Sequence, residues 1–188
     1  MIRVGIGFDA HRFVTGRPCV LGGVEIPHTH GLLGHSDADV ITHAVMDALL
    51  GAAALGDIGQ HFPPSSERWR NASSIAMLRI VADLLRDRKW RVGNIDVTAQ
   101  AEAPRIMPHA EAMRRNIAEA LKIKPSAVSI KATTMEGMGA VGRNEGMTAM
   151  AVATLWKPKI SPWVAILLLF ILLLFYFLFL LFVRHLFF

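Results

Sequence analysis

Three side chains in the first quarter of the sequence, Asp9, His11 and His43, have the types expected of a metal site. Asp9 and His11 are two positions apart in a segment of extended character, and the period of two in a strand places both side chains on one face. A carboxylate oxygen and an imidazole nitrogen on one face can bind a single cation. Three N and O ligands with a fourth position left open are typical of a catalytic zinc site.

His43 must reach this pair from another element, an expected helix on which Asp39 and Asp47 lie four residues to either side of it. The three side chains form one polar stripe, which has two interpretations. The stripe is either a solvated helix face or part of a metal site in which Asp39 or Asp47 accepts a hydrogen bond that fixes the tautomer of His43. Spacing alone leaves both open, because nothing local brings the strand and the helix together.

Strands and helices are expected to alternate irregularly along the chain. Ser36 or Asp37 can cap the first helix, whose apolar positions run from Val40 to Leu49 and weaken at Gly51 and Gly56. The other expected elements are extended segments at Ile2–Phe8, Val20–Ile26, Ile95–Ala101, Val128–Thr134 and Met147–Trp156, a helix at Ala72–Lys89 and a helix from Pro108 that ends before Pro125. This order predicts an α+β fold, a single domain in which helices pack on one face of a mixed β-sheet.

Two glycine patterns resemble dinucleotide-binding loops. The first, Gly5-Ile-Gly7-Phe-Asp9-Ala10, must open a helix to bind a pyrophosphate, but Gly16, Pro18 and the Gly22-Gly23 pair exclude a helix there. The second, residues 137–142, follows a strand, although Asn144 and Gly146 argue against a helix. A phosphate-facing loop remains an alternative for this second pattern.

The C-terminus differs in composition from the rest of the chain, because Trp163 to Val183 contain no charged residue. As a helix this segment would reach roughly 30 Å, the thickness of a bilayer core. It is interpreted either as a membrane anchor or as a low-complexity run translated past a natural stop codon, since Leu and Phe share pyrimidine-rich codons. We therefore divide the chain into a domain at 1–158 and a hydrophobic tail at 159–188, expected to form an apolar helix.

Charge and cysteine content limit the function of residues 1–158. Only Lys159 and Arg184 of the 20 Lys and Arg residues lie beyond Pro158, and all 15 Asp and Glu residues precede it, so this part has a net charge of +3. So small a net positive charge predicts no nucleic-acid partner. Cys19 has no second cysteine to pair with, which together with the polar N-terminus predicts a cytoplasmic location.

Seven blocks in the first 157 residues carry a resemblance to a known family. They are Gly7-Phe-Asp-Ala-His11, Gly31-Leu-Leu-Gly-His-Ser-Asp-Ala-Asp39 with His43, Ala52-Ala-Ala-Leu-Gly-Asp-Ile-Gly59, Phe62-Pro63, Ala103-Pro-Arg105, Lys131-Ala-Thr-Thr-Met-Glu136 and Gly142-Arg143. In order and spacing the chain resembles the 2-C-methyl-D-erythritol 2,4-cyclodiphosphate synthases. The resemblance says nothing about the tail.

The resemblance implies an enzyme of the methylerythritol phosphate pathway, a phosphorus–oxygen lyase that works as a homotrimer. Its substrate would be a cytidine diphosphate ester, 4-diphosphocytidyl-2-C-methyl-D-erythritol 2-phosphate, whose 2-phosphate attacks its own β-phosphate while CMP leaves. Asp9, His11 and His43 match the ligands of one Zn²⁺ per subunit. Glu136 matches a ligand of a second divalent cation, Mg²⁺ or Mn²⁺.

The resemblance also assigns roles to residues that look ordinary by themselves. His35 and Thr134 match side chains that polarise the transferring phosphates, although His35 beside Ser36 also suits a helix cap. The matching substrate contacts are Ser36, Asp57, Gly59, Phe62, Ala101, Pro104, Arg105, Ile106, Met107, Thr133 and Arg143. Arg105 stands where the family usually has lysine, which keeps the charge but changes its geometry.

Two other classes of function remain as alternatives. The chain could be a non-catalytic protein that binds cytidine nucleotides or isoprenoid diphosphates at a membrane, or a membrane scaffold in which the tail matters most. The complete set of Asp9, His11, His43, His35 and Thr134 favours catalysis over both.

Overall fold

The computed structural model describes residues 1–158, 170–176, 178–179 and 182. Contacts within the chain divide it into two units, Met1–Lys157 and Pro158–Phe188. Residues 170–176, 178–179 and 182 of the second unit are helical, and the rest of the predicted tail at 163–183 lies outside the described residues. Among the residues that are described, no helix is both long enough and apolar enough to cross a membrane.

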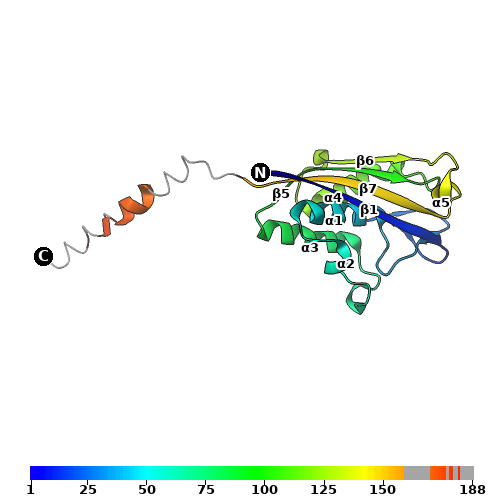
Figure 1. The fold of residues 1–188 in the computed structure, drawn as a ribbon, viewed down its shortest axis with the longest axis horizontal. Helices are drawn as coiled ribbons and strands as arrows, with labels where there is room; N and C mark the ends of the chain where they lie inside the picture. The colour runs from blue at the N-terminus through cyan, green and yellow to red at the C-terminus, as the bar shows by residue number, and fades with distance from the viewer. Residues whose placement is uncertain (159–169, 177, 180–181, 183–188) are drawn as a thin grey trace. The chain divides into compact units, whose positions relative to one another are not determined.

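The first unit is built on a five-stranded mixed sheet (Figure 1), as predicted. The strand order is β4 (Gly31–Leu32), β1 (Ile2–Val14), β7 (Gly146–Trp156), β5 (Arg91–Gln100) and β6 (Val128–Thr133). Strands β5 and β6 are parallel, and the other neighbours are antiparallel. The predicted extended segment at Val20–Ile26 is instead a hairpin of β2 (Cys19–Leu21) and β3 (Val24–Ile26), because Gly22 and Gly23 turn the chain with positive φ.

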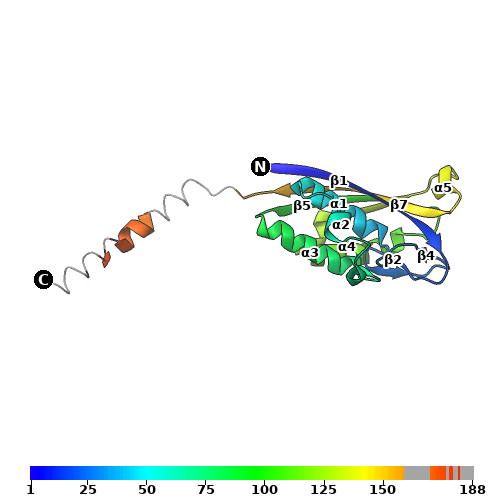
Figure 2. The ribbon, with the colours of Figure 1, turned by 60° about the horizontal axis from the view of Figure 1, so that its bottom comes forward.

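Three long helices, α1 (Val40–Ala53), α3 (Ser74–Asp87) and α4 (Ala110–Leu121), lie on one side of this sheet (Figure 2). The shorter helical elements are α2 (Ile58–His61), α5 (Gly139–Gly142), η1 (Glu67–Trp69), η2 (Met107–His109) and η3 (Pro125–Ala127). Three expectations were wrong in detail. Asp39, and not Ser36 or Asp37, caps α1, because its side chain accepts a hydrogen bond from the Thr42 amide. Gly51 lies inside α1 and does not end it. A four-residue helix forms at Gly139, where no helix was predicted.

The glycines of the first pattern allow α1 to lie directly on β1. A Cβ atom on Gly5 would lie 2.0 Å from the carbonyl oxygen of Ala48, and one on Gly7 would lie 2.0 Å from that of Ala44. Any side chain at these two positions would push the helix away. The pattern therefore serves close packing of backbone on backbone, and β1 continues through it without a turn or a helix.

Helix α1 is buried nearly all round, so its polar stripe is not a solvated face. Asp39 is fully buried, His43 is 6% exposed, and only Asp47 and Gly51 of the helix are outside the core. A helix enclosed in this way lies between the sheet and its neighbouring helices. Polar side chains on it must find partners inside the protein.

The opposite face of the sheet is apolar and open in the single chain. Ile2, Val4, Ile6 and Phe8 of β1 are 56% to 76% exposed, and Val152 of β7 adds to the same surface. These residues alternate with the glycines and with Asp9 and His11, which face the helices. An apolar sheet face of this extent is unusual on a monomer.

Candidate functional site

The structure brings Asp9, His11 and His43 together at the junction of β1 and α1. Oδ2 of Asp9 lies 2.9 Å from Nε2 of His11 and 2.9 Å from Nδ1 of His43, and the two imidazole nitrogens are 3.2 Å apart. All three candidate ligand atoms lie within 4.8 Å of one another. One carboxylate and two imidazoles aimed at one point fit a divalent cation such as zinc. The predicted convergence of strand and helix is confirmed.

The backbone explains why this junction carries the cluster. Gly5, Gly7, Asp9 and His11 share the helix-facing side of β1, and α1 touches the strand at the two glycines. His43 precedes Ala44, whose carbonyl lies against Gly7, so its side chain reaches Asp9. The close contact at the glycines thus places the ligands where the strand and helix are still near each other.

Each histidine has a partner for its other ring nitrogen. Nδ1 of His11 lies 2.8 Å from the carbonyl oxygen of Leu33, to which it can donate while Nε2 faces the cluster. Nε2 of His43 lies 2.9 Å from Oγ of Ser74 and 3.2 Å from Oγ of Ser36. Such partners orient the rings of metal ligands and select their tautomers.

The predicted role of Asp39 or Asp47 behind His43 is wrong. Asp39 accepts from the amides of Gly22 and Gly23 at 2.9 and 2.7 Å and so ties the β2–β3 turn to α1. Asp47 accepts from the Ile58 amide at 2.8 Å. Both carboxylates meet backbone amides instead of the imidazole, and the hydroxyl of Ser74 takes the position that sequence reasoning gave to an acid. No local signal marks Ser74, which begins a helix 31 residues away.

Mutual interaction shifts the pKa values of Asp9 and His43. Burial by itself would raise the pKa of Asp9, but hydrogen bonds to His11 and His43 and their charges hold it well below its usual range. Burial would lower the pKa of His43, but its hydrogen bond to Asp9 and the negative charge of Asp9 raise it overall. The carboxylate is therefore ionised at neutral pH, as a metal ligand must be.

A pocket of about 190 Å³ opens on the cluster. It brings four more of the predicted site residues to the same place, and its lining consists of Asp9, His11, His35, Ser36, His43, Ile58, Gly59, Phe62, Pro64, Trp69 and Met77. Nε2 of His35 lies 3.0 Å from the carbonyl oxygen of Ser66, and the ring of Phe62 meets Trp69 edge-on with centroids 4.9 Å apart. Asp57 does not line this pocket, and its side chain accepts from the Gln60 amide at the start of α2.

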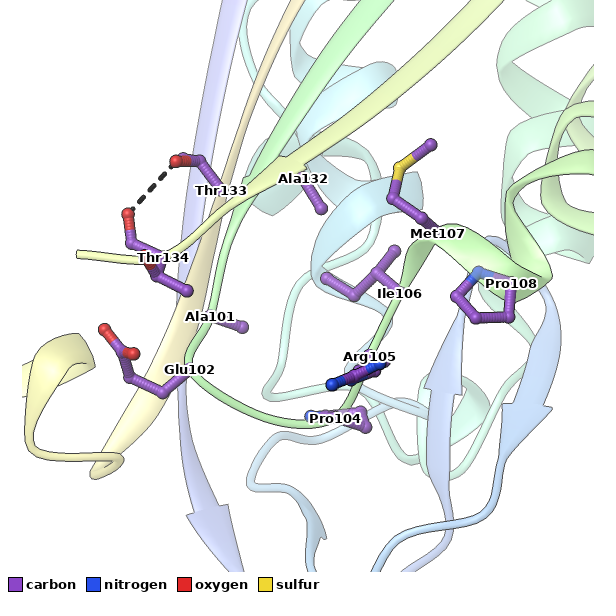
Figure 3. A pocket seen from close by; sticks show the side chains of 10 residues that line it. All are labelled: Ala101, Glu102, Pro104, Arg105, Ile106, Met107, Pro108, Ala132, Thr133 and Thr134. Atoms are coloured by element: carbon purple, nitrogen blue, oxygen red, sulfur yellow. Dashed lines mark hydrogen bonds between the residues drawn. The ribbon is translucent and has the colours of Figure 1, made fainter. Parts of the chain in front are cut away.

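A second and larger pocket, of about 560 Å³, lies where β5 and β6 end (Figure 3). Its lining is Ala101, Glu102, Pro104, Arg105, Ile106, Met107, Pro108, Ala132, Thr133 and Thr134, which includes every predicted residue of the 101–107 loop. Buried Ala101 and Ile106 provide an apolar surface, while backbone groups of the loop and the threonines supply polar atoms. This mixture suits a flat heterocycle joined to a charged group.

Glu136 contacts Thr134 of this pocket, whereas Arg143, at the C-terminal end of α5, is not part of its lining. Glu136 accepts from the Thr134 hydroxyl at 2.6 Å, and its φ of 51° shows a tight turn. Glu102, which sequence reasoning missed, accepts from the Met135 amide at 2.9 Å and so holds this turn against the 101–107 loop. Arg143 pairs with Glu145 at 2.7 Å.

The two pockets of one chain are separate. In the described part of the chain they share no lining residue. Asp9 of β1 pairs with Ala149 of β7, which pairs with Ala99 of β5, which pairs in turn with Ala132 of β6. Three strand spacings, roughly 14 Å, therefore separate Asp9 from β6. The predicted site residues therefore fall into a metal-side group around His35 and a second group around Thr134.

Fold and site define a mixed α/β domain with a group of side chains that could hold a cation and a separate, larger pocket. A model of the YgbB family matches residues 2–156. Two curated relatives named 2-C-methyl-D-erythritol 2,4-cyclodiphosphate synthase, from Cyanothece sp. and Syntrophomonas wolfei, are each 56% identical over 154 residues, which cover 82% of this chain and 96% and 98% of theirs.

Solved structures agree with this match. The bifunctional IspDF of Campylobacter jejuni has a TM-score of 0.81 and 40% identity over 85% of this chain and 43% of its own. The IspF–CDP complex of Plasmodium falciparum has a TM-score of 0.74 and 31% identity over 84% and 97%. The chain belongs to the YgbB family. The 2-C-methyl-D-erythritol 2,4-cyclodiphosphate synthase activity that the resemblance predicted is confirmed by this match.

Proposed function

We propose that the chain converts 4-diphosphocytidyl-2-C-methyl-D-erythritol 2-phosphate to the 2,4-cyclodiphosphate and CMP at a site completed between subunits of a homotrimer. The cluster of Asp9, His11 and His43 beside the pocket of His35 is the observation that carries this proposal. An oxygen of the 2-phosphate forms a bond to the β-phosphorus. The bond from that phosphorus to the oxygen bridging it to the α-phosphate breaks, and its electron pair leaves with CMP.

The proposed cofactors are one Zn²⁺ per subunit and a second divalent cation, Mg²⁺ or Mn²⁺. Asp9, His11 and His43 would hold the first, and Glu136 would contribute to holding the second. When bound, these cations neutralise phosphate charge and polarise the β-phosphate. The partly exposed side chains of Asp9 and His11 leave the cluster open to the pocket.

The residues of the chain hold the two reacting phosphates together. Intramolecular transfer between anions depends on positioning, which can supply about 7–11 kcal/mol of the barrier. His35 and Ser36 lie beside the cation site, and Thr133 and Thr134 offer hydroxyl groups in the second pocket. In the proposed mechanism His35 and Thr134 direct donors at the oxygens on which charge develops.

The remaining predicted contacts divide between the two ends of the substrate. Gly59 and Phe62 in the first pocket, with Asp57 at the start of α2, would receive the methylerythritol part. The loop residues Ala101, Pro104, Arg105, Ile106 and Met107 would receive cytosine. This assignment agrees with a solved relative described as a CDP-bound form. Arg143 is proposed to lie near the threefold axis of the homotrimer, where a phosphate group could bind.

In a homotrimer, pockets that are separate in one chain could meet across a subunit interface. One substrate needs both groups, and these lie on strands three spacings apart in one chain. The open sheet face supports assembly, because its apolar residues would be covered by other subunits. We propose that the second pocket of one subunit meets the metal-side pocket of its neighbour.

The proposed location is the cytoplasm, with the tail at 163–183 as a candidate membrane anchor. The buried free thiol of Cys19 supports a reducing compartment. Truncation after Pro158 tests the tail. If it is an anchor, the truncated enzyme should leave the membrane fraction and keep its turnover, and an unchanged distribution would contradict anchoring.

Release of CMP from the diphosphocytidyl substrate tests the reaction. The purified protein with Zn²⁺ and Mg²⁺ should form equal amounts of CMP and cyclodiphosphate. His43→Ala should abolish turnover and leave binding of cytidine nucleotides largely intact. If the metal-loaded wild type binds nucleotide and releases no CMP, the non-catalytic binding protein becomes the better account.

A further inference from the structure

Ser74, the first residue of α3, occupies a buried position directly behind the proposed metal ligand His43. Its exposed fraction is 0%, and its Oγ lies 2.9 Å from Nε2 of His43. It lines neither of the two pockets described above, so it has no contact with substrate to account for it. A hydroxyl enclosed in this way is there for the partners it meets inside the protein.

The second partner of Ser74 is Asp37. Oδ2 of Asp37 accepts from the Ser74 amide at 2.8 Å, and Oδ1 accepts a short hydrogen bond from the Ser74 hydroxyl. The carboxylate oxygen accepts this hydrogen bond, so the hydroxyl proton of Ser74 points at Asp37. The lone pairs of Oγ are then left for His43.

These directions determine which nitrogen of His43 carries a proton. With the Ser74 hydroxyl committed to Asp37, Nε2 must donate to Oγ. Nδ1, which faces Asp9 and His11, can then give its lone pair to a cation once it has lost its proton. The series of hydrogen bonds from Asp37 through Ser74 to His43 is consistent only with a proton on Nε2 of His43.

Ser36 is a poorer candidate for the same task. Its Oγ lies farther from Nε2 of His43, at 3.2 Å, and also accepts from the Ala38 amide at 3.2 Å. Ser36 lines the pocket beside the cation site, where substrate would compete for its hydroxyl. Ser74 is buried and does not line that pocket.

We infer that Ser74, fixed by Asp37, is a positioning residue that presents Nδ1 of His43 to the bound cation. The inference rests on the proposed metal centre. Removing the outer partner of a metal-bound histidine commonly weakens metal affinity about 10–100-fold. Ser74→Ala should therefore bind metal more weakly, while Ser74→Thr keeps a hydroxyl and should restore most of the affinity.

Ser73 offers a matched control at the preceding position. It is exposed, and its side chain caps α3 through a long contact of 3.4 Å with the Ala76 amide. Ser73→Ala removes a hydroxyl from the same helix end without touching His43. Thermal unfolding of the metal-free variants shows whether Ser73→Ala and Ser74→Ala are both folded.

The experiment is a Co²⁺ titration of the metal-free, full-length protein against a chromophoric chelator, with the d–d absorption spectrum of bound Co²⁺ as a second signal. We expect the dissociation constant to rise about 10–100-fold in Ser74→Ala, with an altered spectrum, and to change less than about threefold in Ser73→Ala and Ser74→Thr. Unchanged affinity and spectrum in folded Ser74→Ala would overturn the inference alone. A wild-type protein that binds no Co²⁺ would overturn the metal centre as well.

Discussion

Nδ1 of His43 lies 2.9 Å from Oδ2 of Asp9, although 34 positions separate the two residues. The contact depends on Gly7, because a side chain there would strike the carbonyl of Ala44 and move α1 away from β1. Close packing at the glycines and assembly of the cation site are therefore one structural feature. Perturbing either one should affect the other.

Replacing a ligand should empty the cation site. In the proposed zinc site Asp9, His11 and His43 supply three ligands, and a site with two would hold zinc far more weakly. We expect His43→Ala to lower bound zinc from about one per chain to a small fraction, measured by metal analysis after dialysis. His30→Ala, which removes a histidine outside the cluster, should keep the full content; equal zinc in both variants would contradict the assignment.

The effect of pH on the metal-free protein follows from the same contact. Because the folded pKa of His43 is raised, its contribution to stability is fully present below the unfolded pKa of about 6.5 and is lost as the pH rises through the folded value. Because the pKa of Asp9 is lowered, its contribution is present above 3.8 and is lost as the pH falls through the folded pKa. The melting temperature without metal should therefore decline above about pH 6.5, and Asp9→Asn should flatten this decline.

Bound metal should reverse this trend. A cation at Nδ1 displaces the proton that the raised pKa of His43 retains, so metal affinity increases with pH. The rise in melting temperature on adding zinc should be larger at pH 8 than at pH 6, as measured by calorimetry. A larger rise at pH 6 would show that His43 is not a ligand.

Two glycine substitutions should change stability in opposite directions. Gly5→Ala places a Cβ 2.0 Å from the Ala48 carbonyl and 2.5 Å from the Ala52 amide nitrogen, both backbone atoms, and should cost about 3 kcal/mol. Gly51→Ala lies in α1 with its nearest atom 3.8 Å away and should stabilise by about 0.5–1 kcal/mol. Denaturant unfolding measures both, and a neutral Gly5→Ala would contradict the close packing of α1 on β1.

The open face of the sheet should be a subunit interface. Phe8 is 56% exposed on that face, so Phe8→Asp should place a charge inside the assembly and reduce the mass measured by light scattering from a trimer to a monomer. CMP release should fall with it if the site needs two subunits. Ile80→Asp changes a residue of α3 that is 38% exposed and should leave the mass unchanged. A trimeric Phe8→Asp variant would exclude this face as the interface.

Much of the fold could be predicted from local patterns. The period of two placed Asp9 and His11 on one face of a strand, and the apolar repeat from Val40 to Leu49 predicted α1, because both signals depend only on near neighbours in the chain. The mixed sheet and its covering helices followed from the order of these elements. Boundaries were less accurate, since β5 begins at Arg91 and not at Ile95.

The sequence by itself determined which side chains could form a cation site and which family they match. Only the tertiary structure decided that α1 is buried. It also decided that Asp39 accepts from the turn at Gly22 and does not contact the His43 ring, and that the hydroxyl of Ser74 is the partner of that ring. It also separated the group around His35 from the group around Thr134. The reason is physical: a hydrogen-bond partner is selected by packing between elements, and residue spacing carries no information about which distant element arrives there.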